Sequence, residues 1–233
     1  MIKVDQKLAA KIEPFDTFWE APENMESGYQ SFGKFYKRNY SKYFPTDKNA
    51  DILAISCGTG YFVNLLTDSG YTSVLGIDSD SEKIQYAVQR GLNCRHVNAF
   101  AFLEERSKQF DYIFCEQEIN HLTKDEILAF MELCRKTLKP KGRIVIHSLN
   151  GANPITGSEA LAQNFDHYNT FTDYSLTQIL EHSGFQNIQT FPLKLYIFYE
   201  NPLNYIGAAL DATLNTLFRL SFIFYGKHNK IFS

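Results

Sequence analysis

The sequence lacks the features that mark several large protein classes. Its 233 residues hold only four cysteines, Cys57, Cys94, Cys115 and Cys134, and no two of them form a C-x-x-C pair. This spacing argues against a zinc cluster and against a compact disulfide framework, and it is typical of reduced thiols in a cytosol. We therefore predict no metal site and a cytoplasmic location.

A basic surface and a secretion signal are also missing. The formal net charge is −3, whereas nucleic-acid binding depends on cationic contacts to phosphates and favours strongly basic proteins. The first twenty residues, MIKVDQKLAAKIEPFDTFWE, carry charges throughout and contain no apolar core. The sequence therefore predicts no nucleic-acid partner and no targeting segment.

What is present is a high apolar content in a periodic arrangement. Hydrophobic residues make up 44% of the chain and aromatic residues 15%, which is enough for a sizeable core. Short apolar runs alternate with helical periodicity, and this rhythm gives a parallel sheet covered on both faces. We predict an α/β, Rossmann-like sandwich with strands near residues 52–56, 73–77, 93–97, 111–115 and 143–147.

Three of the predicted helices have recognisable ends. Ser, Thr and Asp residues cap helices when they precede an apolar periodic segment, and glycine stops helices. The first helix should begin after Ser79 or Asp80 and stop at Gly91. The second should begin with a capping box of Thr123 and Glu126, and the third should begin at Thr172 and stop at Gly184.

The stretch ILAISCGTGYFVNLL, residues 52–66, predicts a strand, a glycine turn and the start of a helix. Val63 stands where a dinucleotide fingerprint has its third glycine, and the Gly-Lys-Ser or Gly-Lys-Thr end of a P-loop is absent. Asp78 follows the second strand, whose carboxyl end should lie beside that of the first. It can accept hydrogen bonds from both hydroxyls of a ribose, which favours a nucleoside without a diphosphate.

The order of the motifs resembles that of class I S-adenosylmethionine-dependent methyltransferases. The glycine turn with Asp78 is followed by FDYIFCEQEINHL and by LKPKGRIVIHSLN, and the resemblance covers roughly residues 25–195. It implies S-adenosylmethionine as cofactor, S-adenosylhomocysteine as product, and a mostly parallel seven-stranded sheet. We expect a single domain at 1–233, with an N-terminal helical cap at 1–45, a Rossmann-like core at 50–195 and a C-terminal amphipathic helix within 196–233.

The resemblance also implies the cofactor contacts. Asn98 can accept from the adenine amino group while Phe100 packs on the ring, although Asn98 is also a good N-cap for a helix that starts at Ala99. Glu116 and Gln117 should line the methionine portion unless they form a solvated loop. The predicted cofactor-binding set is Ser56, Cys57, Gly58, Gly60, Asp78, Ser79, Asn98, Ala99, Phe100, Glu116 and Gln117.

Two residues depart from the family pattern. Ala54 replaces an acidic residue that helps to hold the methionine ammonium, and Ser56 replaces the first glycine. The lost anchor must be supplied otherwise, for example by the carbonyl and side chain of Ser56. A nonenzymatic cofactor-binding or assembly protein is therefore the main alternative to an enzyme, while Val63 disfavours a nicotinamide oxidoreductase.

A finer resemblance concerns the methyl acceptor. Residues 148–185 are similar to methyltransferases encoded with capsule and lipopolysaccharide genes, which implies a nucleotide-activated sugar or a phosphoramidate as the small-molecule acceptor. A hydroxyl acceptor needs a base for its proton, and His121 and His167 are the candidate catalytic residues. Asp166 stands where those relatives have threonine. The predicted substrate-binding residues are Tyr29, Tyr36, His147 and Asn150.

These site residues also have structural interpretations. A single histidine is more often structural than catalytic, and Tyr29 and Tyr36 belong to an aromatic stripe at helical spacing, which is more often core. The C-terminal stretch carries another apolar stripe, but Asp211 and Arg219 disfavour a transmembrane span because each costs about 3 kcal/mol at mid-bilayer. A contact with a second subunit or with a membrane surface stays open. We predict a cytoplasmic O-methyltransferase of surface polysaccharide biosynthesis.

Overall fold

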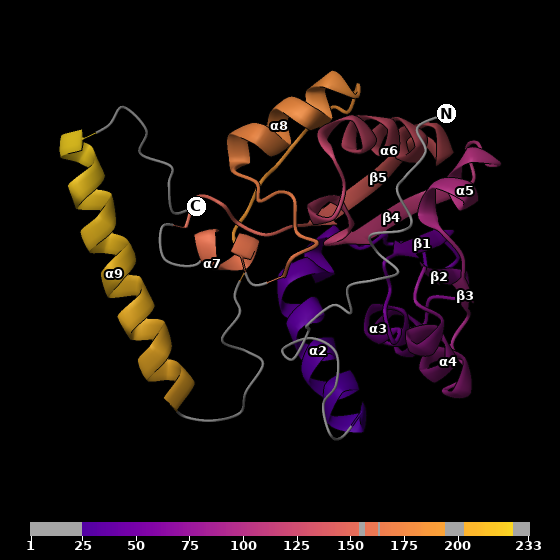
Figure 1. The fold of residues 1–233 in the computed structure, drawn as a ribbon. Helices are drawn as coiled ribbons and strands as arrows, with labels where there is room; N and C mark the ends of the chain where they lie inside the picture. The colour runs from indigo at the N-terminus through magenta and orange to yellow at the C-terminus, as the bar shows by residue number, and fades with distance from the viewer. Residues whose placement is uncertain (1–24, 154–156, 163, 194–202, 226–233) are drawn as a thin grey trace.

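A sheet of five parallel strands forms the centre of the computed structural model, which describes residues 25–153, 157–162, 164–193 and 203–225 (Figure 1). The strands pair in the order β3-β2-β1-β4-β5, so all neighbours of β1 run in its own direction. The five predicted strands are all present. They are β1 (Ile52–Ile55), β2 (Val74–Asp78), β3 (Cys94–His96), β4 (Phe110–Glu116) and β5 (Leu138–His147).

Successive side chains along a strand point to opposite faces of the sheet, so the core is made of two clusters, one on each face. In β1, Ile52 and Ala54 belong to one buried cluster whereas Leu53 and Ile55 belong to the other. Helices α2, α3 and α4 cover the first face, and α5, α6 and α8 cover the second (Figure 1). The helices are α2 (Met25–Tyr40), α3 (Tyr61–Asp68), α4 (Ser81–Gln89), α5 (Ala99–Glu104), α6 (Lys124–Thr137), α7 (Gly157–Ala162) and α8 (Asp173–His182), with 3-10 turns η1 (Ser41–Tyr43) and η2 (Glu118–Asn120).

The three predicted helix ends are confirmed. Asp80 caps α4 by accepting from two backbone N–H groups of its first turn. Thr123 and Thr172 each form a capping box, at α6 and α8 respectively. Gly91 and Gly184 follow α4 and α8 with φ of 82° and 80°, a left-handed conformation that glycine adopts without steric cost.

The predicted count of seven strands is wrong for the described residues, which form five. After α8 the chain runs through residues 185–193 without strand pairing. Asn187 is left-handed, with φ of 57°, and Pro192 has no N–H to donate to a ladder. Phe191 instead stacks on the ring of Tyr43, with centroids 4.6 Å apart. This segment therefore packs beside the N-terminal helical elements instead of extending the sheet.

Aromatic side chains fill the space between α2 and the sheet. The rings of Phe62 and Phe114 stack with centroids 3.8 Å apart, and Tyr36 meets both edge-on. Phe35 of α2 is fully buried. Such ring pairs contribute about 0.5–1.5 kcal/mol each beyond the burial of their area, so α2 is firmly held against the first face.

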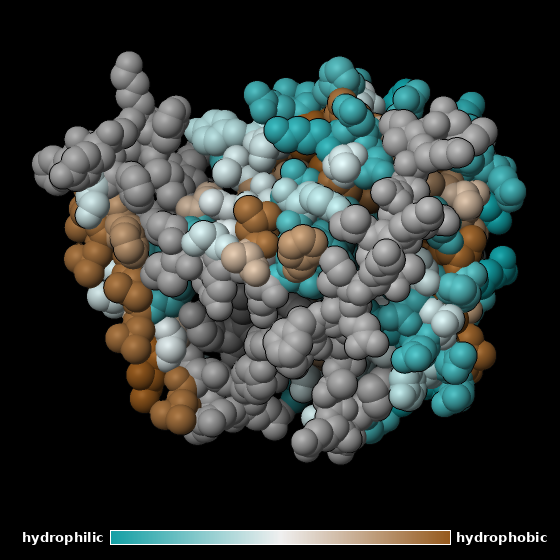
Figure 2. Space-filling view, in the orientation of Figure 1, coloured by the Kyte–Doolittle hydropathy of each residue, from teal (hydrophilic) through white to brown (hydrophobic). Residues whose placement is uncertain are grey.

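Helix α9 (Leu203–Tyr225) lies apart from the sheet and exposes its apolar stripe (Figures 1 and 2). No helix among the described residues is long and apolar enough to span a membrane. The space-filling view shows the brown stripe running along the outer side of the helix. The exposed large side chains of this helix are Leu203, Tyr205, Ile206, Leu210, Leu214, Leu217 and Leu220.

A matched pair of glycines tests how tightly the glycine turn is packed. Gly60 and Gly70 share a left-handed backbone, with φ of 85° and 86°. A Cβ on Gly60 would lie 2.7 Å from Leu92 Cδ1 and 3.2 Å from Ala87 Cβ, whereas one on Gly70 would meet nothing within 4 Å. We expect Gly70→Ala to cost about 1–2 kcal/mol for the strained backbone. Gly60→Ala should cost about 1–3 kcal/mol more for the overlap.

Urea unfolding followed by circular dichroism measures both losses. Equal losses in the two variants would contradict the packing around Gly60.

Candidate functional site

The turn after β1 forms a backbone cradle at the carboxyl edge of the sheet. Ser56, Gly58 and Gly60 all have positive φ, at 55°, 51° and 85°, and Gly60 begins α3. The backbone N–H of Cys57 donates to the carbonyl of Ile77 in β2, at 3.1 Å. The turn is therefore pinned to the neighbouring strand and leaves its surface to a ligand that approaches the backbone closely.

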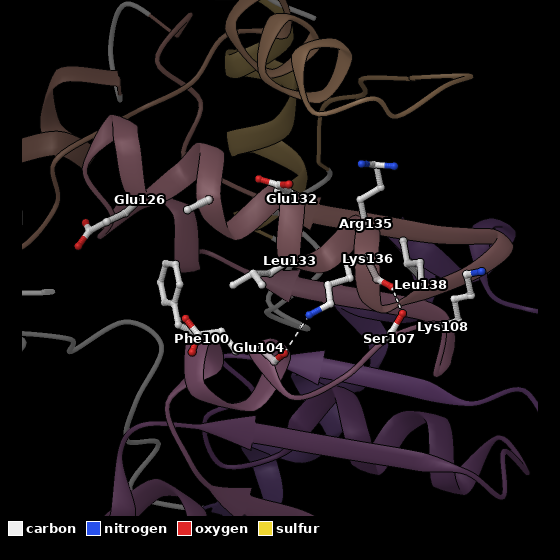
Figure 3. A pocket seen from close by; sticks show the side chains of 11 residues that line it. Phe100, Glu104, Ser107, Lys108, Glu126, Glu132, Leu133, Arg135, Lys136 and Leu138 are labelled. Carbon is white, nitrogen blue, oxygen red and sulfur yellow. Dashed lines mark hydrogen bonds between the residues drawn. The ribbon is translucent and has the colours of Figure 1, made fainter. Parts of the chain in front are cut away.

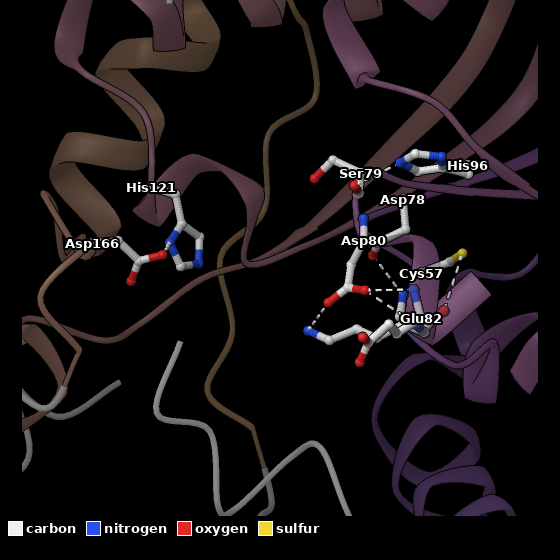
Figure 4. A network of polar contacts seen from close by, with 10 residues as sticks. Cys57, Asp78, Ser79, Asp80, Glu82, His96, His121 and Asp166 are labelled. Atoms are coloured by element: carbon white, nitrogen blue, oxygen red, sulfur yellow. Dashed lines mark hydrogen bonds and ion pairs between the residues drawn. The ribbon is translucent and has the colours of Figure 1, made fainter. Parts of the chain in front are cut away.

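Asp78, the last residue of β2, completes this cradle (Figure 4). Its Oδ2 accepts from the Gly58 N–H and its Oδ1 from the Asp80 N–H, each at 2.8 Å. Each carboxylate oxygen has two lone pairs, so each can still accept one further hydrogen bond. Burial raises the pKa of Asp78 above its ordinary value, although these backbone N–H groups act against the rise. The carboxylate is thus preorganised for two donors, as a ribose provides.

Glu118 is a site residue that the sequence reasoning missed. It lies in η2 after β4, and the Ser56 hydroxyl donates a hydrogen bond to its Oε2. Burial raises the pKa of Glu118, and Ser56 and His121 oppose the rise. A carboxylate therefore lies beneath the turn at Ser56, next to the strand in which Ala54 replaces the acid of the family pattern.

Asn98 takes the structural role that the sequence left open for it. Its Oδ1 accepts from the backbone N–H groups of Phe100 and Ala101, so it is the N-cap of α5. The side-chain oxygen that was expected to accept from the adenine amino group is therefore used by the cap. Phe100 is half-buried and packs against Phe130, with ring centroids 5.6 Å apart. Ala99 is buried behind it.

Ser79 follows β2 and Gln117 follows β4, the two strands that flank β1. Ser79 is exposed, and its carbonyl lies 3.0 Å from Nε2 of His96. Gln117 has a left-handed backbone, with φ of 56°, and its N–H donates to the carbonyl of His147 at 2.8 Å. This left-handed turn directs the chain into η2 and thereby sets the place of Glu118.

Three of the predicted substrate-binding residues, Tyr29, Tyr36 and His147, are buried where α2 meets the sheet. Tyr36 donates to Glu116 Oε2 at 2.5 Å, and Nδ1 of His147 lies 3.3 Å from Glu116 Oε1. Tyr29 donates to the carbonyl of Thr59 at 2.5 Å. These three rings are at most 6% exposed, so the core interpretation of the aromatic stripe is confirmed by their burial. Their contacts fasten α2 over the glycine turn and over the end of β4.

On the other side of the edge, His121 meets Asp166 (Figure 4). His167 lies beside them. His121 Nδ1 lies 3.0 Å from Asp166 Oδ2, and the two histidine rings have centroids 4.8 Å apart. Burial lowers the pKa of His121, but Asp166 and Glu118 outweigh it and the pKa is raised overall. Burial raises the pKa of Asp166, but both histidines outweigh it and the pKa is lowered. Both shifts favour an ion pair.

Buried Asn120 fixes this cluster. The side-chain amide of Asn120 donates to the backbone carbonyl of Asn169 at 2.7 Å. The backbone carbonyl of Asn120 accepts from the N–H of Tyr168 at 2.8 Å. Asn169 in turn donates to the carbonyl of Leu122 at 2.6 Å. The loop that carries Asp166 and His167 is thereby tied to the loop that carries His121. The remaining predicted residue, Asn150, is exposed and caps its own turn by accepting from Ala152.

A groove of about 770 Å³ lies elsewhere, between α5 and α6 (Figure 3). Phe100, Leu133 and Leu138 form its apolar part. Glu104 and Glu132 are on its rim, and the Lys136 ammonium donates to the Glu104 carbonyl at 2.9 Å. This groove contains none of the edge carboxylates or histidines, so we place the candidate site at the carboxyl edge.

The comparison with protein families agrees with this geometry. Residues 28–190 match the model of a family described as a methyltransferase domain. The chain belongs to this methyltransferase family. S-adenosylmethionine is the cofactor of such methyltransferases, as the sequence predicted, and the α/β Rossmann-like fold is confirmed.

Curated relatives of this methyltransferase cover it only in part. A ubiquinone biosynthesis O-methyltransferase of Rickettsia bellii is 29% identical over 104 residues, which are 43% of this chain and 42% of the relative. One of Dinoroseobacter shibae is 28% identical over 158 residues, covering 60% and 62%. The chain spans less than two thirds of the length of these relatives.

A solved structure shares the fold over a longer stretch. An S-adenosylmethionine-dependent methyltransferase of Archaeoglobus fulgidus superposes with a TM-score of 0.62 at 19% identity, covering 80% of this chain and 87% of that one. The identity is low, so this similarity supports the arrangement of strands and helices and leaves the chemistry to the residues of the methyltransferase itself.

The cofactor site yields a direct prediction for Asp78→Ala. This change removes a charged acceptor for two ribose hydroxyls and should weaken S-adenosylhomocysteine binding by about 1.5–3 kcal/mol, or roughly tenfold to a hundredfold. Isothermal titration calorimetry measures the loss. Asp111→Ala is the control, because it makes the same charge change at the start of β4, where Asp111 pairs with Lys139 at 2.8 Å. Equal affinities in both variants would remove Asp78 from the site.

Proposed function

We propose that this chain is an S-adenosylmethionine-dependent O-methyltransferase that acts on a small-molecule hydroxyl. The observation that carries the proposal is the juxtaposition of two groups at one sheet edge: the Asp78 cradle, and a histidine paired with a carboxylate at 3.0 Å. Glu118 accepts from Ser56 in the turn beside Asp78, and its charge raises the pKa of His121. A nucleoside cofactor and an acceptor would thus meet near η2.

The protein's main task in this reaction is alignment. The cofactor supplies a methyl group on a sulfonium sulfur, which leaves as a neutral thioether and needs no acid. The chain must therefore hold the acceptor oxygen in line with that methyl group and keep water away. The glycine turn and Asp78 would hold the ribose, while Glu118 would face the methionine ammonium in the role that Ala54 cannot fill.

The second task is to remove the proton of the acceptor hydroxyl. The Asp166 carboxylate lies 3.0 Å from His121 Nδ1 and stabilises a positive charge on the ring, which leaves the other ring nitrogen to take the proton. Asp166 is therefore a positioning residue in this proposal, and His121 and His167 are the catalytic candidates. An anionic phosphoryl acceptor would not need this step.

The acceptor class rests on resemblance. Residues 148–185 favour a nucleotide-activated sugar or a phosphoramidate of surface polysaccharide biosynthesis, and we propose a cytoplasmic enzyme of that kind. Relatives are named for O-methylation in ubiquinone biosynthesis, which supports an oxygen acceptor without favouring a sugar. Mass spectrometry of products from a panel of nucleotide-activated sugars, phosphoramidates and phenols would separate these classes.

A nonenzymatic cofactor-binding or assembly protein is the second candidate. Ala54 and Ser56 favour it, because they weaken the usual anchor of the methionine ammonium. Calorimetry with S-adenosylhomocysteine discriminates the two candidates. The enzyme proposal expects binding and methyl transfer to an acceptor in the panel. Binding without transfer would favour a nonenzymatic cofactor-binding protein, and absence of both would favour an assembly protein.

We expect His121→Ala to lower turnover on a hydroxyl acceptor by about a hundredfold to ten-thousandfold, because a positioned base contributes about that much. The affinity for S-adenosylhomocysteine should stay near normal. Asp166→Asn should lower turnover less, since it leaves His121 in place and removes only its orienting charge. His182→Ala is the control, an exposed histidine at the end of α8. Loss of turnover in the control alone, or in no variant, would refute this acceptor site.

The exposed stripe of α9 predicts an effect on assembly. Deleting residues 202–233 should change the oligomeric state or the solubility, because an apolar stripe of this size must be buried by a partner. Cofactor affinity should change little. Light scattering coupled to size-exclusion chromatography measures the mass, and flotation with lipid vesicles tests a membrane-surface contact. A truncated protein that stays monomeric but cannot bind S-adenosylhomocysteine would indicate a lid instead.

A further inference from the structure

Three potential metal ligands converge on the acceptor side of the edge. His121, Asp166 and His167 each place one nitrogen or oxygen within 4.8 Å of the others. His121 Nδ1 and Asp166 Oδ2 lie 3.0 Å apart. Two ligands bound to one ion at about 2.0–2.2 Å lie about 3 Å apart or slightly more, so a small inward movement of His167 completes the set.

The hydrogen bonding of this cluster is incomplete. Among the described residues, Asp166 Oδ1 is enclosed without a hydrogen-bond partner, and His121 Nδ1 is near Asp166 but poorly directed for a hydrogen bond. An enclosed polar atom left unsatisfied costs about 1–3 kcal/mol. A cation between the three side chains would take His121 Nδ1 and one oxygen of Asp166 as ligands, and its charge would stabilise the enclosed carboxylate.

The donor set selects the type of ion. Mg²⁺ and Ca²⁺ prefer sites made of oxygen ligands, whereas imidazole nitrogens suit zinc and the other first-row transition metals. Two histidines and one carboxylate are a typical set for a metal with one or more open positions, which a water or a substrate oxygen can occupy. The cluster therefore fits Zn²⁺ better than an alkaline-earth ion.

The scaffold around the ligands is already fixed. The Asn120 amide and carbonyl hold residues 168 and 169 against the loop of His121, and Asn169 holds Leu122. Ligands from two segments far apart in the chain are thus set facing each other by buried hydrogen bonds. Such preorganisation lowers the cost of binding an ion.

We propose that His121, Asp166 and His167 bind a divalent transition-metal ion, with Zn²⁺ as the preferred ion and an open position directed at the acceptor. The role of the ion rests on the proposed function, because it would hold the acceptor oxygen and acidify its hydroxyl. In that case His121 acts as a ligand and the hydroxyl proton passes to solvent. The binding site itself stands on the geometry alone.

The test uses the full chain after treatment with a chelator and removal of the chelator. Calorimetric titration with ZnCl₂ should show one site, and Co²⁺ should give visible absorption of a protein-bound ion. His121→Ala, Asp166→Asn and His167→Ala should each weaken Zn²⁺ binding by at least about a hundredfold, since each removes one of three ligands. His96→Ala and His182→Ala are matched controls, being exposed histidines outside the cluster, and should bind Zn²⁺ normally.

S-adenosylhomocysteine affinity, measured on every variant, reports whether the fold is kept. Zn²⁺ binding that is absent, or that is unchanged in all three ligand variants, overturns the inference. Methyl transfer that persists in the metal-free protein would then leave the proposed function intact without the ion. Conversely, one Zn²⁺ site lost in the three variants supports the inference even if no acceptor in the panel is methylated.

Discussion

The parallel pairing of β1 with both β2 and β4 is the constraint on which the rest of the structure depends. Because all three strands point the same way, their carboxyl ends meet at one edge, and the turns that follow them must lie together there. Ser56, Asp78 and Glu118 follow or end these three strands. Three segments far apart in the sequence thereby supply one cradle, and a shift in either register would separate its carboxylates from the glycine turn.

This edge gathers three carboxyl groups whose environments differ. Asp78 and Glu118 are half-buried, and loss of water raises the pKa of each carboxyl group because few cationic groups oppose it. Asp166 has a lowered pKa because two histidines outweigh its burial. The first two are therefore acceptors poised for ligand donors, whereas the third already has cationic partners. In the proposed function, this edge would hold a neutral ribose, a cationic methionine ammonium and an acceptor at separate places.

The parts that the sequence predicted correctly depend on local rules. Strand positions, the caps at Asp80, Thr123 and Thr172, and the place of Asp78 follow from hydrophobic period, turn chemistry and strand order. Seven strands were expected from the resemblance. Residues 185–193 do not add a strand to the sheet, and Phe191 in this segment stacks on Tyr43 instead. Glu118, too, had no local signal, because its partner Ser56 lies 62 residues away.

Tyr36 and His147 contact Glu116 and have a structural role at the edge of the sheet. Both were expected to meet substrate, yet they occupy the two oxygens of Glu116 and help to lock α2 onto the sheet. A carboxylate that accepts from both sides has little freedom to turn toward a ligand, so this part of the edge is a rigid wall. In the proposed function, the loops held together by Asn120 would contact the acceptor, because they carry His121 Nδ1 and Asp166 Oδ1, which have no hydrogen-bond partner among the described residues. Under this proposal, Glu116 and the side chains that hold it form the rigid part of the site, and the loops around Asn120 form the part that meets the acceptor.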